Sequence, residues 1–225
     1  MGSPVKITLM QHLFLTSSIG IKGVGESIRR SLGHDRTLKT AFIITPVEGD
    51  SDQDDLSWVQ EDRDGLNNNG FITFDYSITN KSKAQIQQDL KDIEVLYISG
   101  GNEFYLKEKS NENNFGDIVR ELVGSNVIYI GTSAGSIITG TDMSALQQLS
   151  DIEPLKKPLD TTGYGLVSFT VLPHWGSDNF KERWLSQKSF DYAFSESSPL
   201  IALNNYQYIE VVGDTWQIVD VRSES

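Results

Sequence analysis

Short runs of apolar, β-favouring residues alternate with helical patterns along the first 130 residues of this chain. The five runs span residues 12–15, 41–45, 71–75, 95–99 and 127–130. Strands that alternate with helices form βαβ units, in which the strands are parallel and helices cover both faces of the sheet. The sequence therefore predicts an α/β fold with a doubly wound, mostly parallel sheet.

Two of the intervening helices can be located from their apolar spacing. Apolar residues between Phe115 and Val123 recur at i, i+3, i+4, i+7 and i+8, and Gly124 ends that helix. A second helix is predicted over residues 51–66, with Ser51 as the candidate N-cap. Leu56, Val59, Arg63 and Leu66 are predicted to lie near one side of this helix.

The second half of the chain is predicted to contain a long loop followed by further strands. Residues 140–165 show neither the helical nor the strand spacing of apolar residues. Loops of this length in compact domains are often functional. A polar helix is expected around residues 181–190. Strands are predicted at residues 169–172, 200–203, 208–212 and 216–221. Because Gly213-Asp214 separates the last two strands, they are predicted to form a C-terminal β-hairpin.

We expect a single domain over residues 10–225. A chain of 225 residues can bury a substantial core, and no internal repeat or linker rich in Pro, Gly or Ser divides it. Met1-Gly2-Ser3 is typical of residues introduced by cloning, and Met10 lies just before the first predicted strand. Residues 1–9 are therefore expected to lie outside the functional domain.

The composition argues against several classes of site. The chain has no cysteine, so a nucleophile has to be an oxygen or a lysine, and its formal net charge of −12 opposes binding of nucleic acid. It has neither His-Glu-x-x-His spacing nor a Gly-Lys-Ser/Thr phosphate loop, so no metal or other cofactor is expected. No apolar run reaches the roughly 18 to 20 residues that span a bilayer, and no export pattern is present. We expect a cytoplasmic protein without a membrane partner.

The pattern Gly131-Thr132-Ser133-Ala134-Gly135 is the strongest indication of chemistry. It follows an apolar strand and opens a helix-compatible segment, which is the context of a nucleophile elbow. In an elbow the strained turn projects the serine oxygen above the sheet, and flanking glycines avoid steric clashes. The same pentapeptide also fits a plain strand-to-helix turn in which Ser133 caps the helix.

A nucleophilic serine needs a base, and the chain offers three histidines. His12 begins the first predicted strand and His34 lies in a Gly-His-Asp turn, so both have structural interpretations. His174 follows the strand at 169–172 and a proline, which would place it at the same rim of the sheet as Ser133. His174 is therefore the predicted general base.

Stabilisation of an oxyanion requires two preorganised donors. The backbone N–H of Ala134, directly after the nucleophile, is one candidate. The turn Ser99-Gly100-Gly101-Asn102 follows another strand, and its glycines would allow backbone N–H groups to approach a substrate carbonyl. A Gly-Gly turn is also common without any function.

Gly100-Gly101-Asn102, Gly131-Thr132-Ser133-Ala134-Gly135 and Pro173-His174, in this order, resemble the peptidase E family of serine peptidases, which includes cyanophycinases. The resemblance runs from about Gln11 to Val221. It implies a flavodoxin-like sheet related to class I glutamine amidotransferases, with Ser133 as nucleophile, His174 as base, and Gly101 and Ala134 as oxyanion donors. Ser99 and Glu103 depart from the family pattern, which has Gly and Thr at these positions.

The resemblance leaves two candidates for the residue that orients His174. An acidic residue between the serine and the histidine would be Asp151, which is our first choice, whereas a residue from a loop after a late strand would be Asn205. A carboxylate stabilises the imidazolium better than an amide, but either can hold the required tautomer.

The resemblance also implies a short peptide substrate. Peptidase E hydrolyses dipeptides with an N-terminal aspartate, and cyanophycinases cut β-linked aspartyl-arginine chains. We expect Asn102, Lys181 and Arg183 to contact the substrate, the two cations by gripping a carboxylate. A monomer or homodimer is expected. A non-catalytic peptide-binding homologue is the alternative, whereas the 51 residues that follow His174 argue against an α/β-hydrolase.

Overall fold

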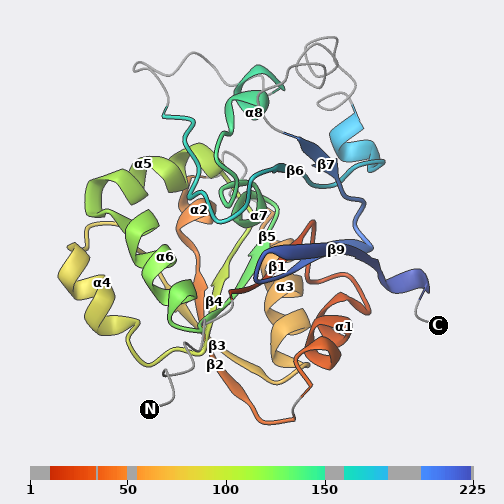
Figure 1. Cartoon of the computed structure of the whole chain (residues 1–225), viewed down its shortest axis with the longest axis horizontal. Coiled ribbons are helices and arrows are strands. Elements are labelled where there is room, and N and C mark those ends of the chain that lie inside the picture. The colour runs from red at the N-terminus through yellow and green to blue at the C-terminus, as the bar shows by residue number, and fades with distance from the viewer. Residues whose placement is uncertain (1–10, 34, 50–54, 150–159, 182–198, 224–225) are drawn as a thin grey trace, which may run out of the picture.

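The computed structural model describes residues 11–33, 35–49, 55–149, 160–181 and 199–223. Within them a seven-stranded sheet has the order β3-β2-β4-β5-β1-β8-β9 (Figure 1). Pairing is parallel from β3 to β1, whereas β8 is antiparallel to both β1 and β9. The strands are β1 His12–Thr16, β2 Leu38–Ile43, β3 Phe71–Tyr76, β4 Val95–Ile98, β5 Ile128–Thr132, β8 Gln207–Val212 and β9 Thr215–Asp220.

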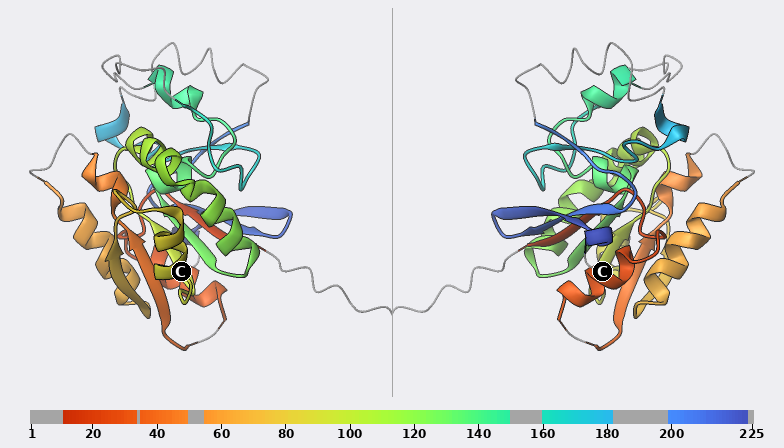
Figure 2. Two further views of the ribbon diagram at one scale, coloured as in Figure 1. Left: turned by 90° about the vertical axis from the view of Figure 1, so that its left-hand side faces the viewer. Right: turned by 90° about the vertical axis from the view of Figure 1, so that its right-hand side faces the viewer.

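Helices cover both faces of this sheet, as predicted for a doubly wound fold (Figures 1 and 2). One face is covered by α1 Val24–Ser31 and α3 Ser57–Asn67, whose apolar residues pack with Phe14 and Tyr97. The opposite face is covered by α4 Lys83–Asp89, α5 Glu103–Asn113 and α6 Phe115–Gly124. Shorter helices are α2 Thr45–Glu48, α7 Ala134–Ile137 and α8 Ser144–Leu149.

The two apolar cores explain why the central strands are continuously hydrophobic. In β1, Leu13 and Leu15 point into one core while Phe14 points into the other, and all three are fully buried. Successive side chains of a strand alternate between faces, so a strand covered on both sides needs apolar residues throughout. The five apolar runs of the sequence correspond to the five parallel strands, β1 to β5, with boundaries that differ by at most three residues.

The C-terminal hairpin is confirmed. β8 and β9 pair in antiparallel fashion with Val212 opposite Thr215, and Gly213 has φ 59° in the turn between them. The hairpin adds two strands at one edge of the sheet (Figure 2). Within the described residues, no helix has both the length and the apolar content needed to cross a membrane.

The strand that precedes His174 does not belong to the main sheet. β6 Thr170–Leu172 pairs in parallel with β7 Leu200–Ala202 in a separate two-stranded sheet. The prediction that His174 lies at the rim of the same sheet as Ser133 therefore needs correction. The two strand ends still converge, because Figure 1 places β6 and β7 close to α7, above the ends of the parallel strands.

Two element boundaries also differ from the prediction. The described part of the second helix begins at Ser57, where Asp55 Oδ1 accepts hydrogen bonds from the backbone N and the hydroxyl of Ser57 at 3.1 and 2.7 Å. The candidate cap Ser51 lies outside the described residues. The region predicted as a loop over 140–165 contains α8, before which Asp142 accepts from the backbone N of Ser144 at 2.8 Å.

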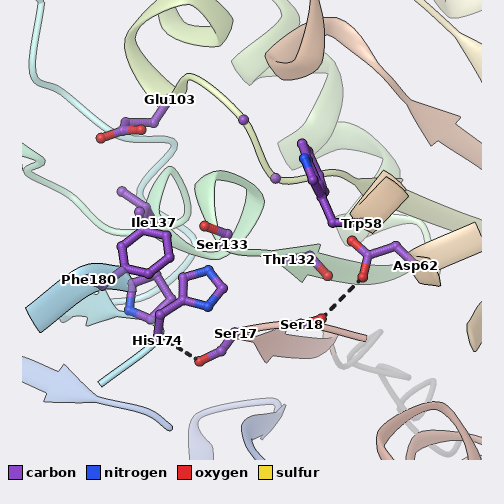
Figure 3. A pocket seen from close by; sticks show the side chains of 13 residues that line it. Ser17, Ser18, Trp58, Asp62, Glu103, Thr132, Ser133, Ile137, His174 and Phe180 are labelled. Atoms are coloured by element: carbon purple, nitrogen blue, oxygen red, sulfur yellow. Dashed lines mark hydrogen bonds between the residues drawn. The ribbon is translucent and has the colours of Figure 1, made fainter. Parts of the chain in front are cut away.

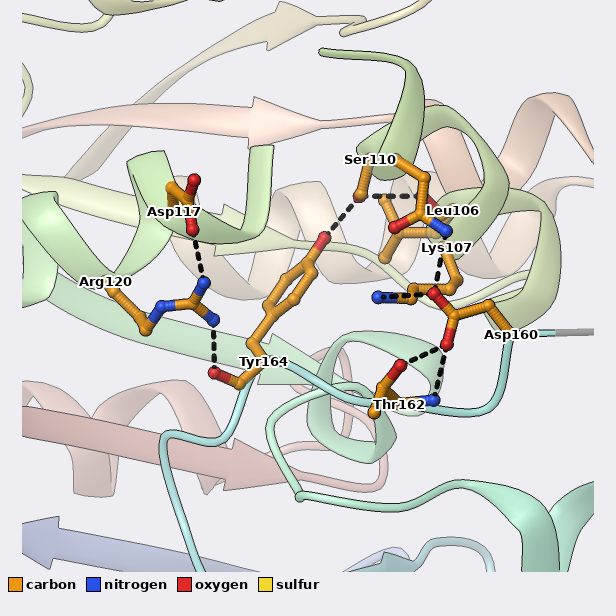
Figure 4. A network of polar contacts seen from close by, with 9 residues as sticks. Leu106, Lys107, Ser110, Asp117, Arg120, Asp160, Thr162 and Tyr164 are labelled. Atoms are coloured by element: carbon orange, nitrogen blue, oxygen red, sulfur yellow. Dashed lines mark hydrogen bonds and ion pairs between the residues drawn. The ribbon is translucent and has the colours of Figure 1, made fainter. Parts of the chain in front are cut away.

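A network of polar contacts fixes residues 160–164 (Figure 4). The hydroxyl oxygens of Tyr164 and Ser110 are 2.6 Å apart, and the backbone N of Thr162 donates to Asp160 Oδ1 at 3.0 Å. Burial raises the pKa of Asp160, but hydrogen bonds, foremost those from Thr162, outweigh burial and hold the pKa well below its usual range. The network anchors this segment against α5.

Candidate active site

The loops at the carboxyl ends of β1, β4 and β5, the segment after β6 and one face of α3 surround a cavity of about 180 Å³ (Figure 3). Ligands of open α/β sheets bind outside the carboxyl ends of the strands, so this is the expected place for a site. The lining residues are Ser17, Ser18, Trp58, Asp62, Gly100, Gly101, Glu103, Thr132, Ser133, Ile137, Pro173, His174 and Phe180.

Ser133 occupies the strained turn predicted for a nucleophile elbow. Its backbone angles are φ 49° and ψ −108°, a conformation that residues other than glycine rarely adopt. A Cβ at Gly131 would lie 2.5 Å from the carbonyl oxygen of Gly135, and a Cβ at Gly135 would lie 2.1 Å from that of Ile98. The two glycines are therefore required by close backbone approach.

The main sheet fixes the position of this turn. The backbone N of Ser133 donates to the carbonyl oxygen of Thr16 at 3.0 Å, and Ser136 Oγ donates to the same oxygen at 2.7 Å. Both contacts tie the start of α7 to the end of β1, the neighbouring strand in the sheet. The side chain of Ser133 points into the cavity (Figure 3).

His174 is held from several directions. Its backbone N donates to Ser17 Oγ at 3.1 Å, and Ser17 Oγ donates in turn to the carbonyl oxygen of Leu203 at 3.0 Å. Its Nδ1 lies 2.8 Å from Oδ1 of Asn205. An amide oxygen accepts hydrogen bonds, so this pair places the proton on Nδ1 and leaves Nε2 unprotonated in the neutral ring.

The structure brings His174 and Ser133 to the same cavity (Figure 3). The orienting contact to His174 comes from Asn205, the second of the two sequence candidates. Asp151, our first choice, lies outside the described residues, as does His34. His12 is accounted for structurally, because its Nε2 lies 3.0 Å from Oε1 of Glu210 on β8.

The Gly-Gly turn after β4 lies against Ser133. A Cβ at Gly100 would lie 3.4 Å from Cβ of Ser133, and Gly101 has φ 118°, which favours glycine. Within the described part of the chain, the backbone N–H groups of Gly101 and Ala134 make no hydrogen bond. Ser99, which departs from the family pattern, is buried and donates to the carbonyl oxygen of Gly100 at 2.8 Å.

The predicted substrate contacts are only partly located. Asn102 Oδ1 accepts from the backbone N of Phe104 and Tyr105 at 3.0 and 2.9 Å and so caps α5. Lys181 is exposed and directly follows the short helix η1, Asp178–Phe180. Arg183 lies outside the described residues. Contacts of Asn102, Lys181 and Arg183 with a substrate remain predictions.

Asp62 lines the cavity and was missed by sequence analysis. Only 2% of it is exposed, and its carboxylate accepts from the hydroxyl of Tyr97 at 2.6 Å, the backbone N of Gly20 at 2.9 Å and Ser18 Oγ at 3.4 Å. Burial raises its pKa to about 6, although these hydrogen bonds act in the opposite direction. The sequence pattern grouped Arg63, and not Asp62, with the apolar residues on one side of α3.

The position of Asp62 could have been found from helical spacing. Val59, Asp62 and Leu66 follow i, i+3, i+7 spacing and are the buried residues of α3. A carboxylate within an apolar stripe is unusual and often indicates a functional site. Arg63 instead makes an ion pair with Asp75 at 2.5 Å.

Glu103 is the second carboxylate of the cavity, with 5% of the residue exposed. It occupies the first turn of α5, where a negative charge is favourable. In Figure 3 it lies on the other side of Ser133 from Asp62. The described lining thus contains two acidic side chains and neither lysine nor arginine, so its charge favours a cationic group on a ligand.

Comparison with known proteins gives a family match over most of the chain. The model of peptidase family S51 matches residues 13–219. An uncharacterised peptidase of Pasteurella multocida is 26% identical over 206 residues, which are 92% of this chain and 96% of the relative. Peptidase E of Shewanella amazonensis is 29% identical over 92 residues, which are 41% of this chain and 37% of that protein.

Two solved structures share the fold. A candidate peptidase E protein of Listeria monocytogenes superposes with a TM-score of 0.80 at 23% identity, covering 94% of this chain and 98% of its own. A peptidase from an acI-B1 actinobacterium gives a TM-score of 0.68 at 18% identity, covering 95% of this chain and 89% of its own. At these identities the likeness concerns the arrangement of strands and helices.

Proposed function

This chain belongs to peptidase family S51, and we propose that it is a serine peptidase of the peptidase E type in which Ser133 is the nucleophile and His174 the general base. One observation carries the proposal. The strained turn at Ser133 and the imidazole of His174 face one cavity, and Nδ1 of that imidazole is 2.8 Å from Asn205 Oδ1. This contact directs the basic Nε2 away from Asn205 and suits proton transfer from the serine.

The proposed reaction proceeds through an acyl-enzyme. As Ser133 Oγ attacks the substrate carbonyl carbon, its proton passes to Nε2 of His174. The N–H groups of Gly101 and Ala134 donate to the resulting oxyanion. When the C–N bond breaks, the imidazolium gives the proton to the leaving amine and the acyl group remains as an ester of Ser133. Nε2 of His174 then takes a proton from a water molecule that attacks the ester carbon, and as the bond from this carbon to Ser133 Oγ breaks, the imidazolium returns the proton to Oγ.

We assign the third position of the triad to Asn205. Its amide oxygen holds the tautomer in which Nε2 of His174 carries no proton and can accept one, as Asn does in Cys-His-Asn sites. Because this amide carries no charge, it stabilises an imidazolium less than a carboxylate would. Asp151, the alternative, would supply that charge, so the two assignments predict different effects of mutation.

We propose short peptides with a free N-terminus as substrates. The Asp62 carboxylate is ionised above its pKa of about 6 and suits an α-ammonium group bound beside Ser133. A preference for N-terminal Asp, as in peptidase E, further requires Lys181 and Arg183 to bind the side-chain carboxylate of that Asp. The acidic lining also favours a second candidate, hydrolysis of β-aspartyl-arginine, because its guanidinium is a cation.

A fluorophosphonate probe tests the chemistry without knowledge of the substrate. We expect one covalent adduct, located at Ser133 by peptide mass spectrometry, and none in Ser133→Ala. The absence of labelling at Ser133 in the folded wild-type protein would contradict the proposal and favour a non-catalytic binding protein.

A substrate panel then separates the specificities. Asp-Leu, Asn-Leu, Ala-Leu, N-acetyl-Asp-Leu and β-Asp-Arg are compared by kcat/KM, in wild type and in Arg183→Ala. Faster hydrolysis of Asp-Leu than of Asn-Leu, with a loss of that difference in Arg183→Ala, is the expected result. Equal values for Asp-Leu and Asn-Leu would refute acidic selection, and dominance of β-Asp-Arg would favour the second candidate.

A further inference from the structure

The ring of Phe180 lies flat against the imidazole of His174. The two ring centroids are 4.3 Å apart and the planes are inclined by only 13° (Figure 3). In this nearly parallel arrangement the phenyl ring stacks on one face of the imidazole. Phe180 therefore contacts the proposed base directly, although it lies six positions further along the chain.

Two consecutive turns produce this contact. The backbone N of Ser177 donates to the carbonyl oxygen of His174 at 3.0 Å, and the backbone N of Phe180 donates to that of Ser177 at 3.1 Å. Gly176 has φ 81° and permits the first reversal. The chain is thus folded back so that residue 180 returns over residue 174.

The stack has different energies for the two charge states of His174. The face of a phenyl ring carries partial negative charge, so it attracts a cation lying over it, whereas a neutral imidazole gains much less. The hydrogen-bond partner of Nδ1 is the neutral amide of Asn205, where a Ser-His-Asp triad has a carboxylate. The imidazolium formed during attack thus has an aromatic face beside it and an uncharged partner at Nδ1.

We propose that Phe180 is a positioning residue that stabilises the imidazolium form of His174 and offsets the missing charge at Asn205. The inference rests on the proposed function of His174 as general base. Because stabilisation of the imidazolium lowers the barrier to proton transfer from Ser133, the effect is expected in the rate and in its pH dependence.

Other charged groups around His174 act on the same equilibrium. Asp62 and Glu103 line the same cavity, and Asp178 and Lys181 lie at the ends of the turn that carries Phe180. All four remain in place when only the ring of Phe180 is replaced. A change of the aromatic residue alone therefore isolates the contribution of the stack.

The decisive variant is Phe180→Leu, which keeps an apolar side chain and removes the aromatic face. We expect the rate of fluorophosphonate labelling at high pH to fall by about 2- to 30-fold, and the midpoint of its pH profile to move to lower pH by about 0.4 to 1.5. Phe180→Tyr, which keeps an aromatic face, should retain the wild-type labelling rate and midpoint. Trp175→Leu is the matched control, since this exposed aromatic side chain lies on the same turn.

The shift of the midpoint separates stabilisation from simple misplacement. If Phe180 only packs against the ring, Phe180→Leu lowers the plateau rate and leaves the midpoint unchanged, which would overturn the proposal. A proton NMR titration of the His174 ring in wild type and Phe180→Leu measures the same shift without catalysis. A failure of the proposed function is recognised separately, because the wild-type protein would then not be labelled at Ser133.

If Phe180→Leu does not fold, fluorinated phenylalanines at position 180 provide the same test. They retain the shape of the ring while its face becomes progressively less negative. The midpoint is expected to fall stepwise with the number of fluorine atoms. An unchanged midpoint throughout the series would overturn the proposal.

Discussion

The two halves of the candidate site are built in different ways. Ser133 lies at the end of β5 in the middle of the main sheet, and backbone contacts with Thr16 and close approach at Gly131 and Gly135 determine its conformation. His174 follows a strand of the separate two-stranded sheet. It depends on side chains from other segments, Ser17 and Asn205 among them, for its position.

The position of Ser133 is thus determined mainly by backbone contacts, and that of His174 mainly by contacts with side chains. Around Ser133 most substitutions that matter would disturb folding, because the constraints are steric and involve the central sheet. Around His174 single side chains can be removed while the main sheet stays intact. Activity and stability should therefore respond together on the Ser133 side and separately on the His174 side.

The largest effect is expected where the two halves meet in the reaction. Ser133→Ala and His174→Ala should each lower kcat by on the order of 10⁴-fold or more, because the two residues act as a unit. The double variant should lose little more than either single variant. Steady-state kinetics with the best peptide of the panel measures this, and near-additive losses would contradict joint action.

Asn205→Ala should give the next largest loss of activity with little loss of folding. Removal of the acceptor at Nδ1 frees the imidazole to adopt the wrong tautomer, so kcat should fall by about 10²- to 10³-fold. The melting temperature is measured in parallel and should change little. Asp151→Asn serves as the control and should remain near wild type, whereas the reverse ranking would transfer the role to Asp151.

On the Ser133 side, Gly135→Ala should lower the free energy of unfolding by about 3 kcal/mol, because its Cβ would lie 2.1 Å from the Ile98 carbonyl oxygen. Activity should be lost with it. Gly124→Ala is the matched control, since nothing lies within 4 Å of a Cβ there and alanine favours helices. Urea unfolding measures both variants, and equal stability would refute the steric account of the elbow.

The smallest effect concerns Asp62 and the pH dependence of stability. Its pKa is raised from 3.8 to about 6 by burial, so the folded state binds the proton more tightly than the unfolded state. This contribution to stability is present below about pH 4 and is lost as the pH rises to about 6, by no more than about 3 kcal/mol. As the pH rises from about 4 to about 6, the urea midpoint of the wild-type protein should fall, and that of Asp62→Asn should fall less.

The exposed Asp64 on the same helix provides the comparison for Asp62. Asp64→Asn should retain the wild-type dependence on pH, because its carboxylate lies outside the cavity lining. Parallel curves for wild type and Asp62→Asn would show that burial of Asp62 does not shift its titration.

The Ser133 half of the candidate site could be predicted from the sequence because its determinants are local. The apolar strand, the glycine spacing and the following helix all lie within 127–139, and parallel strands on a covered sheet have a clear apolar pattern. His174 could be proposed as the base from the sequence, but the strand pairing and the contacts that hold it could not be derived. The pairing of β6 with β7 joins residues that are 30 positions apart, as Thr170 with Leu200.

Residues that act through distant contacts were harder to find. Phe180 follows His174 closely but reaches it only through a reversal of the chain, and single-sequence periodicity does not describe such turns. Asn205 was one of two candidates, and only the contact with Nδ1 of His174 distinguishes it. Asp62 was missed because Arg63, and not the neighbouring carboxylate, was grouped with the apolar residues of α3, although Asp62 is the one that is buried.

The small sheet that precedes His174 has a consequence for thermal inactivation. β6 and β7 each contain three residues, so this unit can open locally at a lower free energy than the main sheet. On warming, His174, the proposed base, would leave its place while β1 and β5 remain paired. Loss of activity would then be reversible and precede the cooperative melting of the domain, and amide hydrogen exchange would be faster at Val171 than at Tyr129.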